Sequence, residues 1–469
     1  MNIARRHHDA VVIGAGFAGL SAACALAAAG ARVLVLEARS QLGGRATAFV
    51  DRETGELVDN GQHVMFGCYR STFEFLRRIG AEGNVRRQDS LELPCYDRTG
   101  RRSVLKCPRL PAPLHLMAGV LMWEPIPWMD RMRSLRLAGP LLRARRRLQR
   151  GEVLDASADK ETVRQWLARH GQGAALTSWL WEPLAVAALN QSVDYASATS
   201  FVRVLAEMFA PDPSAAAIVL PNKPLHETYA LPARDFITQC GGEVRTSALA
   251  RVVVENDRVM AVDVRGERVG ASTVLSAVAW HSIGNLFSPG PPPALANVLK
   301  AAAEMDAQPI VTVNLWYDRE VMSETFAGLP GRTMQWVFDK RLAFGESASH
   351  LSLVSSGASE LTQRSNGELT NLAAAEVREA LPRAGEGKLL RATVIREKQA
   401  TFSLAPGQPK RPGAMTPVRG LFLAGDWIDT GLPATIESAV QSGHTAARAI
   451  LDSGIALHAG PPAARAVGI

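Results

Sequence analysis

The run DAVVIGAGFAG at residues 9–19, together with the helix and strand expected after it, decides the fold of this 469-residue chain. Residues 9–13 form a short β-branched apolar run, which is typical of a strand buried in a parallel sheet. A G-x-G-x-x-G turn follows, and an Ala-rich helix is expected up to Gly30. A second strand is expected over 32–37 and ends in an acid. This order of elements predicts a dinucleotide-binding unit.

Each part of this unit has a physical role. Its glycines allow a tight turn, a close approach of the backbone to a pyrophosphate, and close packing of helix on strand. The free N–H groups at the start of the helix bind phosphates, and an acid 18 residues after the last glycine accepts hydrogen bonds from a ribose. That acid also disfavours a ribose 2′-phosphate. The predicted contacts are Gly14, Gly16, Phe17, Ala18, Gly19, Glu37 and Ala38.

The amino-acid composition is that of a globular protein and indicates which kinds of partner to expect. Hydrophobic residues make up 47% of the chain and charged residues 21%, as in globular proteins. The net charge of +7 is modest, and no recognised nucleic-acid-binding module is present, so we expect no nucleic-acid partner. The five cysteines are scattered and never form CxxC, which argues against a disulfide framework or a metal site and for a reducing compartment.

The chain also lacks an apolar run long enough to span a membrane. Residues 1–8 are short and basic, and glycines interrupt the apolar run that follows, so we read no signal peptide there. We expect a cytoplasmic protein, with peripheral contact at the inner face of the plasma membrane as an open alternative.

The continuation of the N-terminal unit separates FAD from NAD. Gly43, Gly44 and Arg45 resemble the GG-R part of the GG-R-x-x-[ST] signature of the amine oxidase and carotenoid desaturase superfamily of flavoproteins, with Thr47 one position before the Ser/Thr of that signature. The resemblance implies that these three residues lie along the FAD diphosphate. Small residues and an Arg fork suit a pair of phosphates.

A second flavin motif lies near the other end of the chain. A buried strand over 421–424 leads to Gly425 and Asp426, and a helix is expected to begin near Thr435. By resemblance, Asp426 binds the ribityl chain, while the backbone of 434–436 (Ala434, Thr435, Ile436) faces the flavin pyrimidine. A helix start there stabilises negative charge on reduced flavin. No cysteine lies in this segment, so we expect non-covalent FAD.

A third segment lies between the two motifs. A helix is expected over 224–242, and the alternation over 250–264 with an Asn-Asp turn predicts a β-hairpin. By resemblance, Val252 and Val253 pass the FAD adenine with their backbone.

These segments predict an α/β fold, with a discontinuous Rossmann-like FAD domain and an α+β substrate domain of the amine oxidase and phytoene desaturase type. We assign 1–84, 221–290 and 411–452 to the FAD domain, 85–220 and 291–410 to the substrate domain, and 453–469 to a loose tail.

Two adjacent stretches bear on the substrate. Residues 110–129 are apolar and broken by prolines, and eight arginines alternate with leucines over 131–150. An apolar patch beside a basic amphipathic helix suits attachment to a membrane surface. Ordinary domain helices with a solvated Arg face explain the pattern equally well.

The most informative local motif is Gly61-Gln62-His63, with Tyr69 after it. It resembles the bacterial squalene-associated FAD-dependent desaturases, also called hydroxysqualene dehydroxylases. The segments 425–438 and 396–402 do so too, and these matches span nearly the whole chain. In the superfamily the 61–63 position passes close to the isoalloxazine, so the resemblance adds these three residues to the predicted FAD contacts.

The resemblance implies an isoprenoid lipid substrate and reductive removal of the allylic hydroxyl of hydroxysqualene. Reduced FAD would give the hydride while an acid assists departure of hydroxide, and the candidate acids are Asp429 and His63. No electron-donor site can be read from the sequence, and the oligomeric state stays open. A carotenoid-type desaturase is the main alternative. A non-enzymatic isoprenoid carrier on the same fold is a further one, and an amine oxidase is less favoured.

Overall fold

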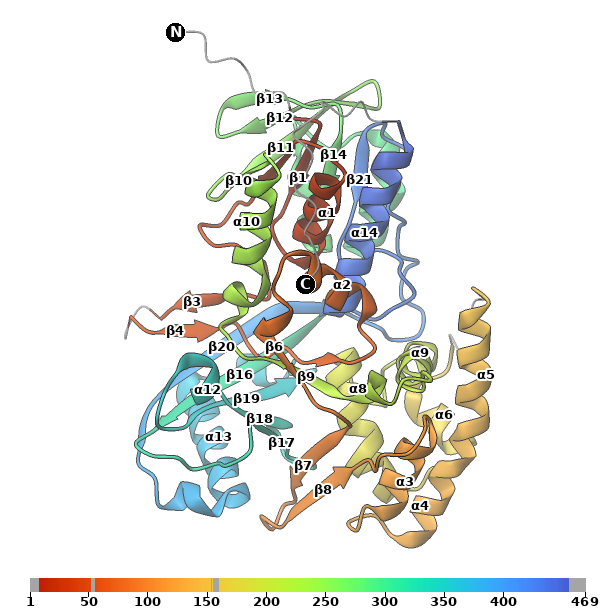
Figure 1. Cartoon of the computed structure of the whole chain (residues 1–469), viewed down its shortest axis with the longest axis vertical. Helices are drawn as coiled ribbons and strands as arrows, with labels where there is room; N and C mark the ends of the chain where they lie inside the picture. The colour runs from red at the N-terminus through yellow and green to blue at the C-terminus, as the bar shows by residue number, and fades with distance from the viewer. Residues whose placement is uncertain (1–7, 52–54, 153, 155–159, 455–469) are drawn as a thin grey trace, which may run out of the picture.

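Two β-sheets of different kinds organise the chain, one in each half of the view in Figure 1. The computed structural model describes residues 8–51, 55–152, 154 and 160–454. The basic start of the chain (1–7) and all of the expected tail except Ser453 and Gly454 lie outside the described residues.

The upper sheet is parallel and has five strands. Its order is β10 (Glu243–Arg245), β2 (Val33–Leu36), β1 (Ala10–Ile13), β14 (Val274–Ser276) and β21 (Leu421–Leu423). Alternate residues of β1 belong to two different cores: Val12 packs with the helices on one face, and Val11 and Ile13 pack with the segments on the other. A strand covered on both faces must be apolar throughout, which explains the unbroken apolar run of 10–13.

Four helices cover one face of this sheet. They are α1 (Phe17–Ala28), α2 (Arg70–Arg78), α10 (Leu231–Gln239) and α14 (Ile436–Asp452). The other face carries a second sheet of β13 (Glu267–Gly270), β12 (Arg258–Val264), β11 (Ala250–Glu255) and β15 (Phe287–Ser288). The β11–β12 hairpin turns at Asn256 and Asp257, which have φ of +52° and +53°, as a two-residue hairpin turn requires.

The lower sheet has seven strands and is mostly antiparallel. Its order is β20 (Leu389–Phe402), β16 (Ala307–Tyr317), β19 (His350–Ser356), β18 (Trp336–Asp339), β17 (Phe326–Gly328), β7 (Glu92–Tyr96) and β8 (Arg102–Lys106). Helix α13 (Asn366–Ala380) packs on one face through Leu369, Ala373 and Val377, while α11 (Ala296–Ala303) and the short α12 (Arg341–Phe344) lie in the connections. The opposite face looks into the molecule.

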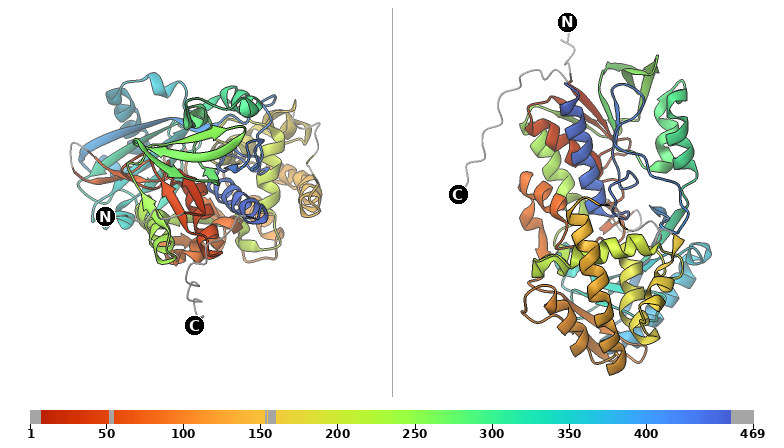
Figure 2. Two further views of the ribbon diagram at one scale, coloured as in Figure 1. Left: turned by 90° about the horizontal axis from the view of Figure 1, so that it is seen from above. Right: turned by 90° about the vertical axis from the view of Figure 1, so that its right-hand side faces the viewer.

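Helices fill the remaining corner below the upper sheet, as Figure 2 shows from the side. They are α3 (Leu114–Met122), α4 (Trp128–Ser134), α5 (Ala138–Gln149), α6 (Val163–Arg169), α7 (Ala174–Leu176), α8 (Glu182–Leu189) and α9 (Ala198–Met208). Two small sheets join the halves: β3 (Ala48–Val50) with β4 (Leu57–Asp59), and β5 (Met65–Phe66) with β9 (Ile218–Pro221) and β6 (Val85–Arg87).

The basic helix expected over 131–150 is not continuous. A 3₁₀ turn over Leu135–Leu137 separates α4 from α5. Nor are all its arginines solvated, because Arg145 is buried and its Nη1 lies 2.5 Å from Glu207 Oε2. The division into two domains at the expected boundaries stays a prediction.

Candidate active site

One cavity of about 810 Å³ runs from the upper sheet into the space between the lower sheet and the helices. Residues from both ends of the chain line its upper part, among them Gly14, Glu37, Arg45 and Asp426. Apolar residues of the lower sheet and of α3, α5 and α8 line its lower part. A groove for a dinucleotide is therefore continuous with an apolar chamber.

The turn between β1 and α1 depends on its glycines. Gly14 has φ of +105°, and a side chain there would also press on the carbonyl of Ala277. A Cβ on Gly19 would lie 1.9 Å from the carbonyl oxygen of Gly14, so α1 can pack on the turn only without one. The sequence-based roles of these two glycines agree with this geometry.

The start of α1 offers donors to an anion. The N-cap, Gly16, has no side-chain cap, and the first turn contains no acidic residue. No described residue accepts a hydrogen bond from the N–H of Phe17 or Ala18. Unpaired N–H groups at the positive end of a helix that faces a cavity form a binding site for phosphate.

Glu37 closes the groove at the end of β2. It is buried, and its carboxylate accepts hydrogen bonds from Ala15 N at 2.8 Å and Arg39 N at 2.9 Å. Each carboxylate oxygen has a second acceptor site, so Glu37 can still accept from the hydroxyls of a ribose. Ala38 lies beside it in the cavity wall.

Gly43 and Gly44 lie against the glycine-rich turn between β1 and α1. Gly43 and Gly44 have φ of +111° and +59°, and a Cβ on Gly44 would lie 3.2 Å from the Cα of Gly16. Tyr229 holds this loop: its hydroxyl donates to Gly43 O at 2.7 Å, and its ring stacks on Phe17 with centroids 3.5 Å apart. Tyr229 lies in a π-helical turn before α10, and sequence reasoning missed it because such turns have no clear sequence signature.

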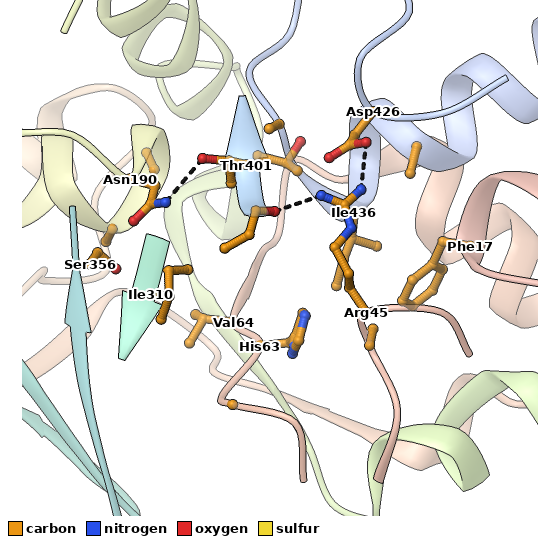
Figure 3. A pocket seen from close by; sticks show the side chains of 18 of the residues that line it. Phe17, Arg45, His63, Val64, Asn190, Ile310, Ser356, Thr401, Asp426 and Ile436 are labelled. Carbon is orange, nitrogen blue, oxygen red and sulfur yellow. Dashed lines mark hydrogen bonds and ion pairs between the residues drawn. The ribbon is translucent and has the colours of Figure 1, made fainter. Parts of the chain in front are cut away.

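Arg45 joins the two ends of the chain. Its Nη2 donates to Asp426 Oδ1 at 2.6 Å, and its Nη1 donates to Ala400 O at 2.6 Å (Figure 3). Burial lowers the pKa of Arg45, but the Asp426 carboxylate outweighs burial and raises it. The guanidinium is therefore a fixed positive charge at the centre of the cavity wall.

The start of α14 points into the same space. Thr435 is its N-cap and accepts from Ser438 N, and Ala434, Thr435 and Ile436 line the cavity. Glu437 turns away and accepts hydrogen bonds from Ser71 N and Thr72 N, both at 2.9 Å. It thus caps α2, which has no side-chain cap of its own.

The Gly61-Gln62-His63 loop also lines the cavity, and a buried lysine holds it in place. Lys340 is buried, lies 2.7 Å from Asp59 Oδ2, and donates to Gln62 Oε1 at 2.8 Å. Burial lowers the pKa of His63 to about 4, with Lys340 and Arg45 adding to the effect and Asp59 opposing it. His63 is therefore neutral at pH 7.

The apolar chamber arises from the period of the strands. On β20, Ile395, Glu397, Gln399 and Thr401 line the cavity at alternate positions. The inner faces of β16 to β19 add Ile310, Thr312, Phe326, Trp336, Phe338, Val354 and Ser356. The wall is polar toward Arg45 and apolar further away.

The structure corrects two site predictions. Asp429, predicted as an acid near the flavin, is exposed and does not line the cavity; its carboxylate accepts from Gly431 N, and Arg411 lies 3.6 Å away. Val252 and Val253 are buried inside the β11 sheet, and Ala248, Leu249 and Ala250 line the groove instead. The hairpin was recognised, but the residues that line the groove are the two before β11 and its first residue.

Sequence reasoning also missed Glu397, which lies in the cavity wall within the segment 396–402. Residues 396–399 are all polar, so no alternation in the sequence distinguished Glu397 from its neighbours.

The residues present fit FAD. The groove combines unpaired N–H donors, an Arg for the diphosphate, a carboxylate for the ribose, and glycines where side chains would fill the space. No group of three or more metal-ligating side chains occurs among the described residues. No described helix is both long and apolar enough to span a membrane.

Comparisons with known proteins agree with this site. The sequence model of the flavin containing amine oxidoreductase family matches residues 17–451. Hydroxysqualene dehydroxylase from Rhodopseudomonas palustris is 31% identical over 94% of this chain and 98% of its own. A second one, from Zymomonas mobilis, is 28% identical over 93% and 97%. A 15-cis-phytoene desaturase from an Oncidium hybrid cultivar is 25% identical over 94% of this chain and 78% of its own.

Solved structures share the fold. An oxidoreductase from Methanosarcina mazei superposes with a TM-score of 0.69 at 18% identity over 93% of this chain and 99% of its own. Putrescine oxidase bound to putrescine has a TM-score of 0.70 at 17% identity over 95% and 99%. The expected α/β fold of the amine oxidase type is confirmed, and so is the flavin cofactor. This chain belongs to the flavin-containing amine oxidoreductase family and is a FAD-dependent oxidoreductase.

Proposed function

We propose that this enzyme removes the allylic hydroxyl of hydroxysqualene by reduction, giving squalene. The observation that carries the proposal is the continuity of the FAD groove with a chamber walled by apolar strands and helices, which suits a long hydrocarbon with little polarity. The hydroxysqualene dehydroxylases, at up to 31% identity over nearly their whole length, support the same substrate.

The reaction breaks a C–O bond and forms a C–H bond at the same carbon. It consumes a hydride and a proton and releases water, with the proton drawn from bulk water and an external two-electron donor restoring the cofactor. Bound FAD in its reduced form supplies the hydride.

In this proposal the chain's own residues bind the flavin and orient the substrate. The start of α14 would place the positive end of a helix beside the flavin and so stabilise its anionic reduced form, while Arg45 would bind the diphosphate. Because His63 is neutral at pH 7, its proposed role is to donate a hydrogen bond from its ring rather than to release a proton. The apolar chamber excludes water from the reacting carbon.

Anaerobic single turnover tests the proposal. Dithionite-reduced protein is mixed with hydroxysqualene, and squalene is extracted while the visible absorbance of oxidised flavin is followed. We expect squalene in proportion to reoxidised flavin. Oxidised protein that instead introduces double bonds into a C30 or C40 polyene precursor, without acting on hydroxysqualene, would make it a desaturase, as the phytoene desaturase relatives suggest.

We also propose that α3 and α4 dock on a lipid bilayer and admit the substrate. Five large apolar side chains are exposed on these helices, namely Leu114, Met122, Trp128, Met129 and Met132, and Leu110 is exposed just before α3. Helix α3 also lines the cavity through Leu116, Met117 and Val120, so the same helix faces both the surface and the chamber. On the neighbouring segments Arg136, Arg143 and Arg146 are exposed and form no ion pair with any described residue, which suits anionic headgroups.

Vesicle sedimentation tests this docking. We expect the protein to bind vesicles that contain anionic lipid, and a Trp128→Ser, Met129→Ser double variant to bind them much less with unchanged flavin content. Leu342→Ser and Leu390→Ser remove exposed apolar side chains elsewhere and are the matched control. Equal binding by the double variant and the control would refute docking through α4.

A further inference from the structure

A buried asparagine fixes the direction of one hydroxyl in the cavity wall. Asn190 follows α8 with φ of +53°, and only 5% of the residue is exposed. Its Oδ1 accepts a hydrogen bond from Gly357 N at 2.8 Å. Its Nδ2 donates to Gln308 O at 3.1 Å and to Thr401 Oγ1 at 3.0 Å (Figure 3).

This arrangement cannot be reversed. The backbone N–H of Gly357 can only donate, so the atom of Asn190 that faces it must be the oxygen. The amide nitrogen then faces Gln308 and Thr401, and both of its hydrogens are used. Asn190 is therefore a fixed donor to the Thr401 hydroxyl.

Because Thr401 Oγ1 accepts from Asn190, its own hydrogen must point elsewhere. No described residue accepts a hydrogen bond from it. Thr401 lines the cavity on the inner face of β20, directly after Ala400, whose carbonyl accepts from Arg45. The Thr401 O–H is thus left to donate to a group in the chamber beside the flavin groove.

Other hydroxyls reach this wall without such orientation. Thr312 and Ser356 also line the cavity, but no described side chain donates a hydrogen bond to the hydroxyl of either. Only for Thr401, among these three, does the surrounding structure decide which way the hydrogen points.

We propose that Thr401 binds the hydroxyl oxygen of the substrate and that Asn190 is its positioning residue. The assignment rests on the proposed dehydroxylation, in which the oxygen is the group that leaves. A donor on that oxygen holds the C–O carbon beside the flavin and stabilises negative charge as the bond breaks. Squalene has no oxygen, so it leaves this donor unpaired, and the product binds less tightly than the substrate.

The test compares Thr401→Val with Thr401→Ser in FAD-loaded protein. We expect Thr401→Val to lower kcat/KM for hydroxysqualene by about tenfold or more, as expected for one lost hydrogen bond to a developing charge. Thr401→Ser keeps the donor and restores most of the activity. Thr393→Val makes the same change on the same strand outside the cavity and is the matched control.

A second readout separates binding of the oxygen from a structural role. Inhibition by squalene is measured beside KM for hydroxysqualene. We expect Thr401→Val to lose the preference for hydroxysqualene over squalene while its flavin content stays that of the wild type. If Thr401→Val does not retain FAD, Thr401→Cys keeps the size with a weak donor and takes its place.

The outcomes are distinct. Wild-type protein that does not convert hydroxysqualene would overturn the proposed function and this assignment with it. Active wild type together with a Thr401→Val variant that keeps the wild-type preference would overturn the role of Thr401 alone. If Thr401→Val loses activity and Thr401→Ser does not restore it, Thr401 contributes through its packing and not through its hydroxyl.

Discussion

Arg45 connects stretches of chain that are 381 and 355 residues away in sequence, through Asp426 and the carbonyl of Ala400. Both bonds involve a charged donor, and the side chain is partly shielded from solvent. Such bonds contribute more than neutral ones because the charge is not dispersed into water. Arg45 is thus a structural bridge between the two ends of the chain as well as the residue proposed to bind the diphosphate.

We expect Arg45→Met to lose flavin. The variant keeps the length of the side chain but removes its donors, and it leaves Asp426 buried without its partner. A loss of about 1.5–3 kcal/mol corresponds to roughly 10- to 150-fold weaker FAD binding. Flavin per protein after gel filtration measures this. Arg77→Met, on the exposed face of α2, is the control and should keep full flavin; equal retention in both variants would contradict the bridge.

The lowered pKa of His63 predicts that the folded protein loses stability as the pH falls. Its pKa is lowered to about 4 in the folded protein, whereas an unfolded histidine titrates near 6.5. Between these values the unfolded chain binds the extra proton, so stability is full above about pH 6.5 and falls as the pH drops toward about 4.

The expected contribution of His63 is up to about 1 kcal/mol per pH unit within that window. Denaturant unfolding of FAD-loaded wild type and His63→Gln at about pH 7.5 and pH 5 measures it. The variant should lose less stability than the wild type. An identical loss in both would show that other groups cause the acid sensitivity.

At this scale the sequence indicated the groups of the flavin site but not their environment. Gly14, Glu37 and Asp426 could be predicted because a spacing along the chain encodes their role. The buried pair of Lys340 and Asp59 could not, because its partners are far apart in sequence and meet only through the fold. Asp429 was misplaced because neighbouring residues of a loop can face opposite sides.

Among the elements, α2 and α14 are coupled by one side chain. Glu437, in the first turn of α14, accepts from Ser71 N, Thr72 N and Thr72 Oγ1 at the start of α2. One acidic residue thus faces the positive ends of two helices. Because α2 follows directly after the His63 loop and Tyr69, this contact also fixes the end of the flavin-facing wall.

We expect Glu437→Gln to destabilise the protein by about 2 kcal/mol, because an amide brings N–H groups against the N–H groups of α2. Urea unfolding measures the change, and hydrogen exchange at Ser71 and Thr72 should rise first. Glu74→Gln removes only an exposed pair with Arg78 and should cost about 0.5 kcal/mol or less. A similar small effect for both variants would rule out the shared cap.

Helices and strands with a strong apolar period were predictable from sequence, as β1, β16, β19 and α14 show. The break between α4 and α5 was not. Residues 131–150 have the composition of one amphipathic helix, but packing buries Arg145 against Glu207 of α9 and turns the chain at 135–137. Tertiary contacts overrode local preference there.

For the molecule as a whole, the flavin groove is made of segments from both ends and the middle of the chain. A dinucleotide in this groove would lie against the β1–α1 turn, residues 248–250 and the start of α14 at the same time. We expect cofactor binding to stabilise these parts together.

Removal of FAD should lower the stability of the whole fold, and adding FAD at a hundred times its Kd should restore about 2.7 kcal/mol. Thermal unfolding of stripped and reloaded protein measures this, with riboflavin, which lacks the diphosphate and adenosine, as the control ligand. Restoration by riboflavin alone would mean that the groove around α1 contributes little.

The overall architecture followed from the order of motifs, since a β-α-β start and a distant closing strand leave few topologies. The shape and extent of the chamber could not be predicted from the order of motifs, because they depend on how the seven-stranded sheet packs over α3 and α8.

The position of β21 and α14 in the chain has a consequence for biosynthesis. Ribosomes translate residues 421–452 after every other segment that lines the flavin groove. A nascent chain that has emerged only as far as β20 has most of the apolar chamber but neither Asp426 nor the helix start at Thr435. Cofactor loading therefore has to wait until residues 421–452 have been translated, whatever the rate at which the earlier segments fold.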